Sequence, residues 1–219
     1  FEFYFTRIVQ QDDYYLYKRS ALKALPIGVV LTIPATGSES NSYTVLTNGS
    51  DKRGSGAKVF IPKFAILDPE NVYSLPKNQT AYGLVDMFLH TTETYFVNDE
   101  FINLQERFAE GLLKAVVEIG PKLVNDLTNE KLRKQSFWCG NVALSGFLSK
   151  GTSGGDWVCH AIEHEFSAIN DMAHGAGLAI VFPAWLTVVG KHNPKKVLKY
   201  SKEIFNVDFA CKFDNFFSN

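Results

Sequence analysis

Four of the five histidines in this 219-residue chain lie in two short groups. Asp86 and His90 are four positions apart in a helical pattern, so their side chains leave one helix face about one turn apart. His160 and His164 have the same spacing, and His174 follows ten positions later at a glycine-flanked boundary. One carboxylate and up to four imidazoles could therefore converge on a divalent cation. Imidazole suits Fe and Zn, and a single carboxylate adds a hard ligand and compensates charge.

Each pair has a simpler interpretation when it is taken alone. An Asp and a His at this spacing usually form a solvated helix face or a small structural hydrogen bond. Both groups together, in a chain with one other histidine at His192, favour a metal site. We expect neighbouring apolar side chains to bury these helix faces, and buried polar groups need partners. These expected covering residues are Val85, Phe88, Ile162 and Phe166.

Residues 160–164 (HAIEH) also fit a different zinc-enzyme pattern. H-x-x-E-H is the inverted motif of some zinc peptidases, with Glu163 as the general base. That scheme needs a further ligand downstream, for which the sequence offers Glu165 and Glu203 without supporting context. It also leaves Asp86, His90 and His174 without a role. The peptidase is an alternative that explains less of the sequence.

A second candidate binding feature is the loop at residues 33–41 (IPATGSESN), which follows an expected strand. Its hydroxyl groups and backbone N–H groups could contact a phosphate or a ribose, although Thr-Gly-Ser after a strand is usually a simple turn. The sequence contains no G-x-G-x-x-G fingerprint. The Gly-rich segment 151–156 (GTSGGD) is interpreted as a flexible connection.

The composition is that of an ordinary globular protein. Hydrophobic residues make up 46% and charged residues 21%, and the formal net charge is −1. This balance disfavours disorder and provides no broad electrostatic surface for nucleic acid or anionic lipid. Three cysteines, Cys139, Cys159 and Cys211, are too few for a disulfide scaffold and favour a reducing compartment.

No membrane or secretory segment is recognised. The longest apolar stretch, residues 177–190, has 14 residues and contains a proline, which is too short for a bilayer span. The first 13 residues lack the basic region and cleavage site of a signal peptide. We therefore expect a cytoplasmic protein without nucleic-acid or membrane partners.

The elements that must position these residues change in type near residue 75. Before it, β-branched runs broken by turn residues predict strands within 28–37, 42–56 and 58–72. After it, apolar residues recur with helical spacing, and helices are predicted at 81–96, 103–120, 136–148, 157–169, 174–186 and 194–205. Asn78 or Thr80 is the expected N-cap of the first helix, and Pro121 is the expected stop of the second. Strands followed by helices indicate an α+β arrangement or two domains.

Three segments together closely resemble the iron-containing (group III) alcohol dehydrogenases, and most of all their NAD(P)H-dependent butanol dehydrogenase branch. The segments are residues 32–41, 64–96 and 154–186, and the resemblance extends from about residue 24 to about residue 205. It implies a dehydroquinate synthase-like fold, in which a dinucleotide-binding α/β domain precedes a helical metal-binding domain. We accordingly expect residues 1–75 to be a remnant of the first domain and residues 76–219 to form the second.

The resemblance assigns roles to the histidine groups. It implies that Fe²⁺ or Zn²⁺ is bound by Asp86, His90, His160 and His174. The position of His164 corresponds to a histidine that does not bind the metal but lies near the substrate and the nicotinamide. His164 would then shuttle the proton.

For the cofactor NAD(P), the resemblance implies contacts from Thr36 and Ser38 in the loop and from Lys52, with Lys58 as a near competitor. The family's Gly-rich pyrophosphate loop is missing, and the chain looks truncated at both ends.

The expected activity is hydride transfer between NAD(P)(H) and a short-to-medium aliphatic alcohol or aldehyde such as butanol or butanal. A catalytically silent metal-binding fragment is the alternative.

Two further expectations concern surfaces. Phe88 and Trp157 are expected to line the substrate site and to suit an aliphatic chain. An incomplete sheet and the Phe-rich segment 211–219 predict self-association, and we expect a homodimer.

Overall fold

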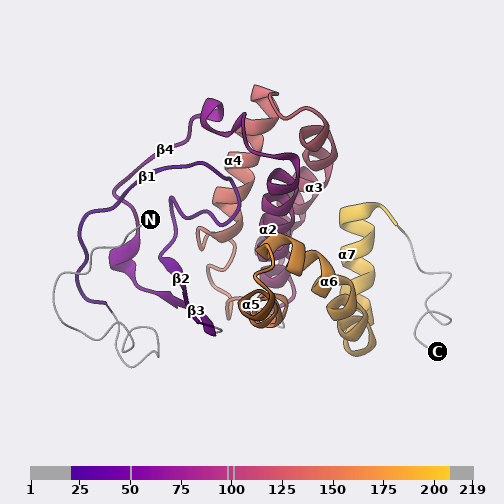
Figure 1. The fold of residues 1–219 in the computed structure, drawn as a ribbon. Coiled ribbons are helices and arrows are strands. Elements are labelled where there is room, and N and C mark those ends of the chain that lie inside the picture. The colour runs from indigo at the N-terminus through magenta and orange to yellow at the C-terminus, as the bar shows by residue number, and fades with distance from the viewer. Residues whose placement is uncertain (1–20, 50, 98, 101, 208–219) are drawn as a thin grey trace.

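The computed structural model describes residues 21–49, 51–97, 99–100 and 102–207. Within these residues, every strand lies before residue 67 and every α-helix begins after residue 76. The strands lie to one side of the helices, and the last helix lies on the other side of the molecule (Figure 1). Expectations about the first 20 residues, Cys211 and the Phe-rich segment fall outside the described residues.

The strands form two small sheets. β1 (Gly28–Val30) pairs in parallel with β4 (Phe64–Ile66), and β2 (Tyr43–Asn48) pairs with β3 (Asp51–Gly56) as an antiparallel hairpin. Within the predicted run at 28–37, the strand covers only residues 28–30, and the loop that follows leads to the β2–β3 hairpin. Within the predicted run at 58–72, only the three residues of β4 form a strand, and two short 3₁₀ helices, η1 (Lys58–Phe60) and η2 (Pro69–Val72), flank it.

Six α-helices follow within the described part of the chain, as the periodicity predicted. They are α2 (Lys77–Tyr95), α3 (Asn103–Asn125), α4 (Glu130–Leu144), α5 (Val158–Asn170), α6 (His174–His192) and α7 (Pro194–Phe205). α2 packs against α3, α4, α5 and α6 and is therefore central to the helical part. None of the described helices is both long enough and apolar enough to span a membrane.

Two predicted helix ends were wrong. α2 begins directly after Pro76 and has no side-chain cap, so Asn78 and Thr80 lie inside its first turn; Thr80 instead accepts a hydrogen bond from Arg133 at 3.2 Å. Pro121 does not stop α3, which continues to Asn125. A proline removes only its own N–H donor, so the other backbone hydrogen bonds of the helix can continue past it. The Pro121 carbonyl, near the end of α3, accepts a hydrogen bond from the side-chain amide of Asn125 at 2.9 Å.

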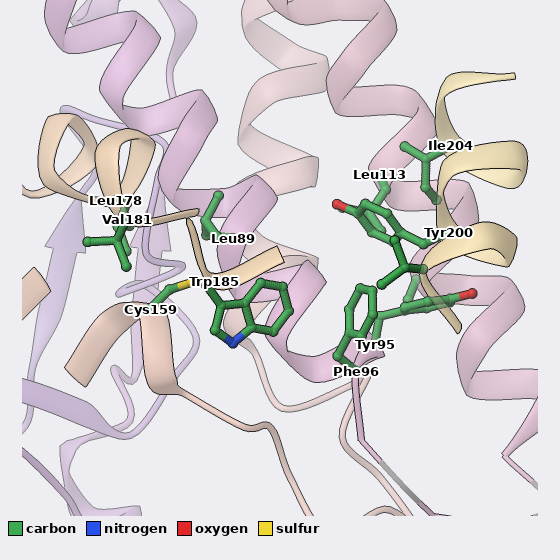
Figure 2. Packing of buried hydrophobic residues seen from close by; sticks show 12 residues of the cluster. Leu89, Tyr95, Phe96, Leu113, Cys159, Leu178, Val181, Trp185, Tyr200 and Ile204 are labelled. Atoms are coloured by element: carbon green, nitrogen blue, oxygen red, sulfur yellow. The ribbon is translucent and has the colours of Figure 1, made fainter. Parts of the chain in front are cut away.

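The main hydrophobic core lies between α2, α3, α5, α6 and α7. Leu113 and Tyr200 are fully buried in it, and Figure 2 shows Leu113, Tyr200 and Ile204 meeting between α3 and α7. Tyr95 and Phe96 at the end of α2 pack against Tyr200, with ring centroids 5.7 and 5.1 Å away. The core also contains the buried free thiol of Cys159, and that of Cys139 lies in a second apolar cluster. This apolar body fixes the helices that carry the histidines.

An ionic cluster joins α3 to α7 beside this core. Glu106 accepts hydrogen bonds from Lys196 and Lys199. The Glu106 and Lys196 side chains are only 11% and 13% exposed, so water weakens this pair less than a surface pair. Burial alone would raise the pKa of Glu106, but the two ammonium groups hold it below its ordinary value.

We predict that Glu106→Gln lowers the free energy of unfolding by about 1–3 kcal/mol at pH 7, because two charge-assisted hydrogen bonds weaken. The folded-state pKa is lowered, so this contribution is complete above the unfolded glutamate pKa of about 4.3 and is lost as the pH falls through the folded-state value. Urea unfolding at pH 7 and in steps below pH 4.3 measures both effects. Glu118→Gln, at an exposed position of the same helix, is the control. A difference between parent and Glu106→Gln that persists at the lowest pH would contradict this assignment.

Candidate metal centre

One face of α2 carries three buried polar side chains in succession. Asp86, His90 and Glu93 are 3%, 4% and 0% exposed, and their spacing of four and then three residues keeps them on one side of the helix. Burying these groups is unfavourable unless each finds a partner. Their partners come from α5 and α6.

α5 and the start of α6 place three more histidines opposite this face. His160 is 7% exposed and stacks on His90, with ring centroids 4.4 Å apart. α5 ends at Asn170, the next residue, Asp171, has a left-handed backbone with a φ of 49°, and α6 then begins with His174 itself. The ring of His174 lies 5.3 Å from that of His160.

Three of the predicted metal ligands, the histidines, converge on one carboxylate oxygen of the fourth. Oδ1 of Asp86 lies 3.5 Å from Nδ1 of His90, 3.5 Å from Nε2 of His160 and 3.4 Å from Nε2 of His174. Oδ1 of Asp86, Nδ1 of His90 and Nε2 of His160 are buried and have no hydrogen-bond partner. Buried polar atoms without partners are rare in folded proteins. Their convergence fits a cation with N and O donors such as Fe²⁺ or Zn²⁺.

Two buried carboxylates hold the outer nitrogens of the histidine rings. Glu93 is hydrogen-bonded to Nδ1 of His160, and Glu163 is hydrogen-bonded to Nδ1 of His174. Glu93 also accepts from the backbone N–H of Cys159 at 2.6 Å. These contacts aim Nε2 of both rings at Asp86, and such partners commonly orient metal-binding histidines.

The charges of the cluster shift its pKa values. Burial alone would raise the pKa of Asp86, but the nearby histidines hold it below its ordinary range. Burial lowers the pKa of His90 to about 3. For His160 burial opposes the charge, yet the nearby carboxylates of Asp86 and Glu93 raise the pKa to about 9.

His164 lies beside the cluster rather than within the convergence on Asp86. Its ring centroid is 5.4 Å from that of His174, and the side chain is half-buried. Burial, together with positive charge on His174 and Lys52, lowers the pKa of His164 to about 4. This ring is therefore neutral at pH 7.

Glycines permit the helices to approach closely enough for this arrangement. A Cβ at Gly175 would lie 2.3 Å from the carbonyl oxygen of Tyr82 on α2. A Cβ at Gly177 would lie 2.8 Å from Cγ of Glu163 on α5. The first turn of α6 is thereby packed against both helices, which brings His174 to Asp86.

The predicted covering residues were largely wrong. Phe88 is two positions from both Asp86 and His90, which places it on the other side of α2, where it packs edge-on against Phe182 at 5.9 Å. Val85 packs against the same core, and Ile162 and Phe166 are 42% and 47% exposed. Phe88 therefore does not line the site.

Trp157 does lie at the site. Its ring is 6.1 Å from that of His90 and 5.5 Å from that of His160. Its backbone has a φ of 54°, a left-handed conformation that is unusual for a bulky side chain. This conformation directs the chain into α5 immediately before the histidines.

The predicted cofactor loop has exposed hydroxyl groups on a fixed backbone. Thr36 and Ser38 are exposed, whereas Gly37 lies against α4, where a Cβ would be 2.8 Å from the Gly140 carbonyl oxygen. Asn141 of α4 donates to Glu39 at 2.8 Å. The loop is therefore held while its two hydroxyl side chains face outward.

The structure distinguishes Lys52 from Lys58, the other candidate for the cofactor contact. Lys52 of β3 reaches α5 and donates to the hydroxyl of Ser167 at 2.7 Å, whereas Lys58 is exposed.

Sequence reasoning missed the roles of Glu93, Glu163 and Ser167 around the histidines. Glu93 had a usable signal, because it lies seven residues after Asp86 on the same helix face.

The peptidase alternative assigned Glu163 as a general base. Its side chain is fully buried and hydrogen-bonded to His174, which leaves it poorly placed to activate a water molecule. His160 and His164 also do not converge on one point, because their ring centroids are 6.5 Å apart and nearly perpendicular. The geometry argues against this alternative.

Comparison with known proteins identifies related sequences and structures. Residues 80–215 match the model of the Fe-containing alcohol dehydrogenase family, C-terminal, and residues 4–69 match the iron-containing alcohol dehydrogenase model. The chain is 45% identical over 199 residues to a probable NADH-dependent butanol dehydrogenase 1 of Bacillus subtilis (strain 168), covering 90% of this chain and 51% of that protein. It is 38% identical over 186 residues to the NADPH-dependent aldehyde reductase YqhD of Escherichia coli (strain K12), covering 84% and 48%.

A solved structure has a similar fold. The crystal structure of NADH-dependent butanol dehydrogenase A from Thermotoga maritima superposes with a TM-score of 0.86 at 40% identity, covering 90% of this chain and 50% of that one. The chain thus spans about half the length of the relatives it matches.

We predict that Gly175→Ala lowers the free energy of unfolding by about 1–3 kcal/mol, because its methyl group forces α6 away from α2. Gly111→Ala on α3 is the matched control, since a Cβ there meets nothing within 4 Å. We expect that control to gain roughly 0.5–1 kcal/mol from higher helix propensity. Urea unfolding of the three proteins measures both changes, and equal effects of the two substitutions would refute the packing argument.

Proposed function

The chain belongs to the iron-containing alcohol dehydrogenase family, and we propose that it binds Fe²⁺ or Zn²⁺ through Asp86, His90, His160 and His174. We further propose that it transfers hydride between NAD(P)(H) and a short-to-medium aliphatic alcohol or aldehyde, such as butanol or butanal. The observation that carries the proposal is the convergence of three buried, unpartnered N and O atoms from α2 and α5, which Nε2 of His174 on α6 joins at 3.4 Å from Oδ1 of Asp86. The names of the relatives support the substrate class.

The donor set suits this reaction. Asp86 supplies a single negative charge among four donors, and neutral imidazoles supply the others. Glu93 and Glu163 keep two of the rings aimed at Asp86. When bound, the metal supplies Lewis acidity, which lowers the pKa of an alcohol hydroxyl and polarises an aldehyde carbonyl.

His164 is proposed to handle the proton of the reaction. It lies beside His174 and is half-buried, so an imidazole nitrogen can face the reacting oxygen while the ring stays accessible to solvent. In alcohol oxidation this nitrogen accepts the hydroxyl proton, and in aldehyde reduction it donates the proton. Trp157 contributes apolar surface next to His90 and His160, which favours an aliphatic substrate.

The cofactor assignment is a separate part of the proposal. Thr36 and Ser38 present hydroxyl groups from a fixed loop, which supports their contact with NAD(P). Residues 1–75 would belong to the dinucleotide-binding domain and residues 76–219 to the helical metal-binding domain. A cofactor contact of Lys52 and a homodimeric assembly stay predictions.

We expect the full chain, purified without oxygen, to contain about one equivalent of Fe or Zn by elemental analysis. His174→Ala should lose most of this metal, because it removes one of four donors from the centre. His192→Ala is the matched control, since it lies exposed at the other end of α6. Absence of metal from the parent, or equal metal in His174→Ala, would refute the ligand assignment.

The activity is tested by following NADH and NADPH oxidation in the presence of butanal. We expect aldehyde-dependent oxidation that is lost in His174→Ala and retained in His192→Ala. Metal binding without oxidation would identify the chain as a catalytically silent metal-binding fragment of its family. Metal-dependent peptide hydrolysis without oxidation would instead revive the peptidase alternative.

A further inference from the structure

A lysine outside the helical body is connected to the proposed metal centre through a buried carboxylate. Lys52 lies in β3, and its Nζ is 2.7 Å from Oγ of Ser167 and 3.7 Å from Oε2 of Glu163. The Lys52 side chain is 17% exposed, and that of Glu163 is fully buried. The β2–β3 hairpin and α5 are thus joined by an ion pair between Lys52 and Glu163 that is largely shielded from solvent.

The Glu163 oxygen that faces Lys52 also contacts His174. Oε2 is hydrogen-bonded to Nδ1 of His174, whose Nε2 lies 3.4 Å from Oδ1 of Asp86. The contacts therefore run from Lys52 through Glu163 and His174 to Asp86. Glu93, which holds His160, is anchored differently, because it accepts the backbone N–H of Cys159 on α5.

We infer that Glu163 and Lys52 are positioning residues for His174, and that docking of the β2–β3 hairpin on α5 sets the metal affinity of the centre. This inference rests on the proposed role of His174 as a metal ligand. Glu163 fixes which ring nitrogen carries the proton, which leaves Nε2 free to bind. Lys52 fixes Glu163 in turn, by compensating its charge and restricting its rotation.

Elementary chemistry supports both steps. A neutral imidazole binds a metal through the nitrogen that lacks a proton, so a carboxylate at Nδ1 selects Nε2 for the metal. A fully buried carboxylate needs a compensating charge or hydrogen bond. The missing side chain at Gly177 leaves room for Glu163 to lie between α5 and α6, where a Cβ would come within 3.0 Å of its Oε1.

The test uses Co²⁺ as a spectroscopic probe on the full chain, with affinity measured by competition against a chelator. We expect Glu163→Gln, which keeps the shape but loses the charge, to weaken Co²⁺ binding by about 10–100-fold. The visible absorption bands of bound Co²⁺ should shift as the His174 ring reorients. Glu165→Gln is the matched control, because Glu165 is exposed on the same helix.

Lys52 gives a second test, in which charge alone and a positioning role predict opposite changes in Co²⁺ affinity. By charge alone, Lys52→Met removes a cation near the centre and should strengthen Co²⁺ binding. A positioning role predicts weaker binding, retained affinity in Lys52→Arg, and no change in Lys58→Met. Because Lys52 acts through Glu163, adding Lys52→Met to Glu163→Gln should have little further effect.

The outcomes are distinguishable. Stronger Co²⁺ binding in Lys52→Met, or parent-like affinity and spectrum in Glu163→Gln, would overturn the inference while leaving the metal site in place. A parent chain that binds no Co²⁺, or binds it equally in His174→Ala, would instead overturn the proposed function. Urea unfolding of each variant separates loss of fold from loss of positioning.

Discussion

A buried carboxylate determines the arrangement of the helices around it. Asp86 is 3% exposed on the central helix α2, in surroundings where a charged group is far less stable than in water. Its charge must be met from outside α2 as well as from His90, and the histidines of α5 and α6 meet it. Those rings in turn need their outer nitrogens satisfied, which brings Glu93 and Glu163 into the interior. The apolar core beside this cluster fixes the three helices, so the buried charges are held without access to bulk water.

Sequence reasoning succeeded where the information was local. Spacings of four residues placed Asp86 with His90 on one helix face and His160 with His164 on another, and periodicity located all six described helices. Spacing alone could not show that His174 reaches the same point, because this depends on close packing at Gly175 and Gly177. The family resemblance supplied that step. Phe88 was misplaced although local geometry sufficed, since a residue two positions from both Asp86 and His90 points away from them.

Errors at element boundaries have similar tertiary causes. β1 and β4 have three residues each and exist through mutual pairing of Gly28–Val30 with Phe64–Ile66, a contact that composition does not reveal. Pro121 is a common helix breaker, yet packing of α3 against α2, α4 and α7 carries the helix through it. The contact of Glu163 with Lys52 could not be predicted from the sequence either, because Lys52 is far away along the chain and only the packing of the β2–β3 hairpin brings it to α5.

The left-handed backbone of Trp157 has a consequence for how this protein can change. Holding a bulky residue at a φ of 54° costs on the order of 1–3 kcal/mol, which a glycine at the same position would largely avoid. Selection for thermostability would therefore favour substitution of Trp157 by glycine. Glycine would gain conformational ease there, but it would remove the indole that adjoins His90 and His160. At Trp157, the substitution that would stabilise the fold would thus also remove a side chain from the site.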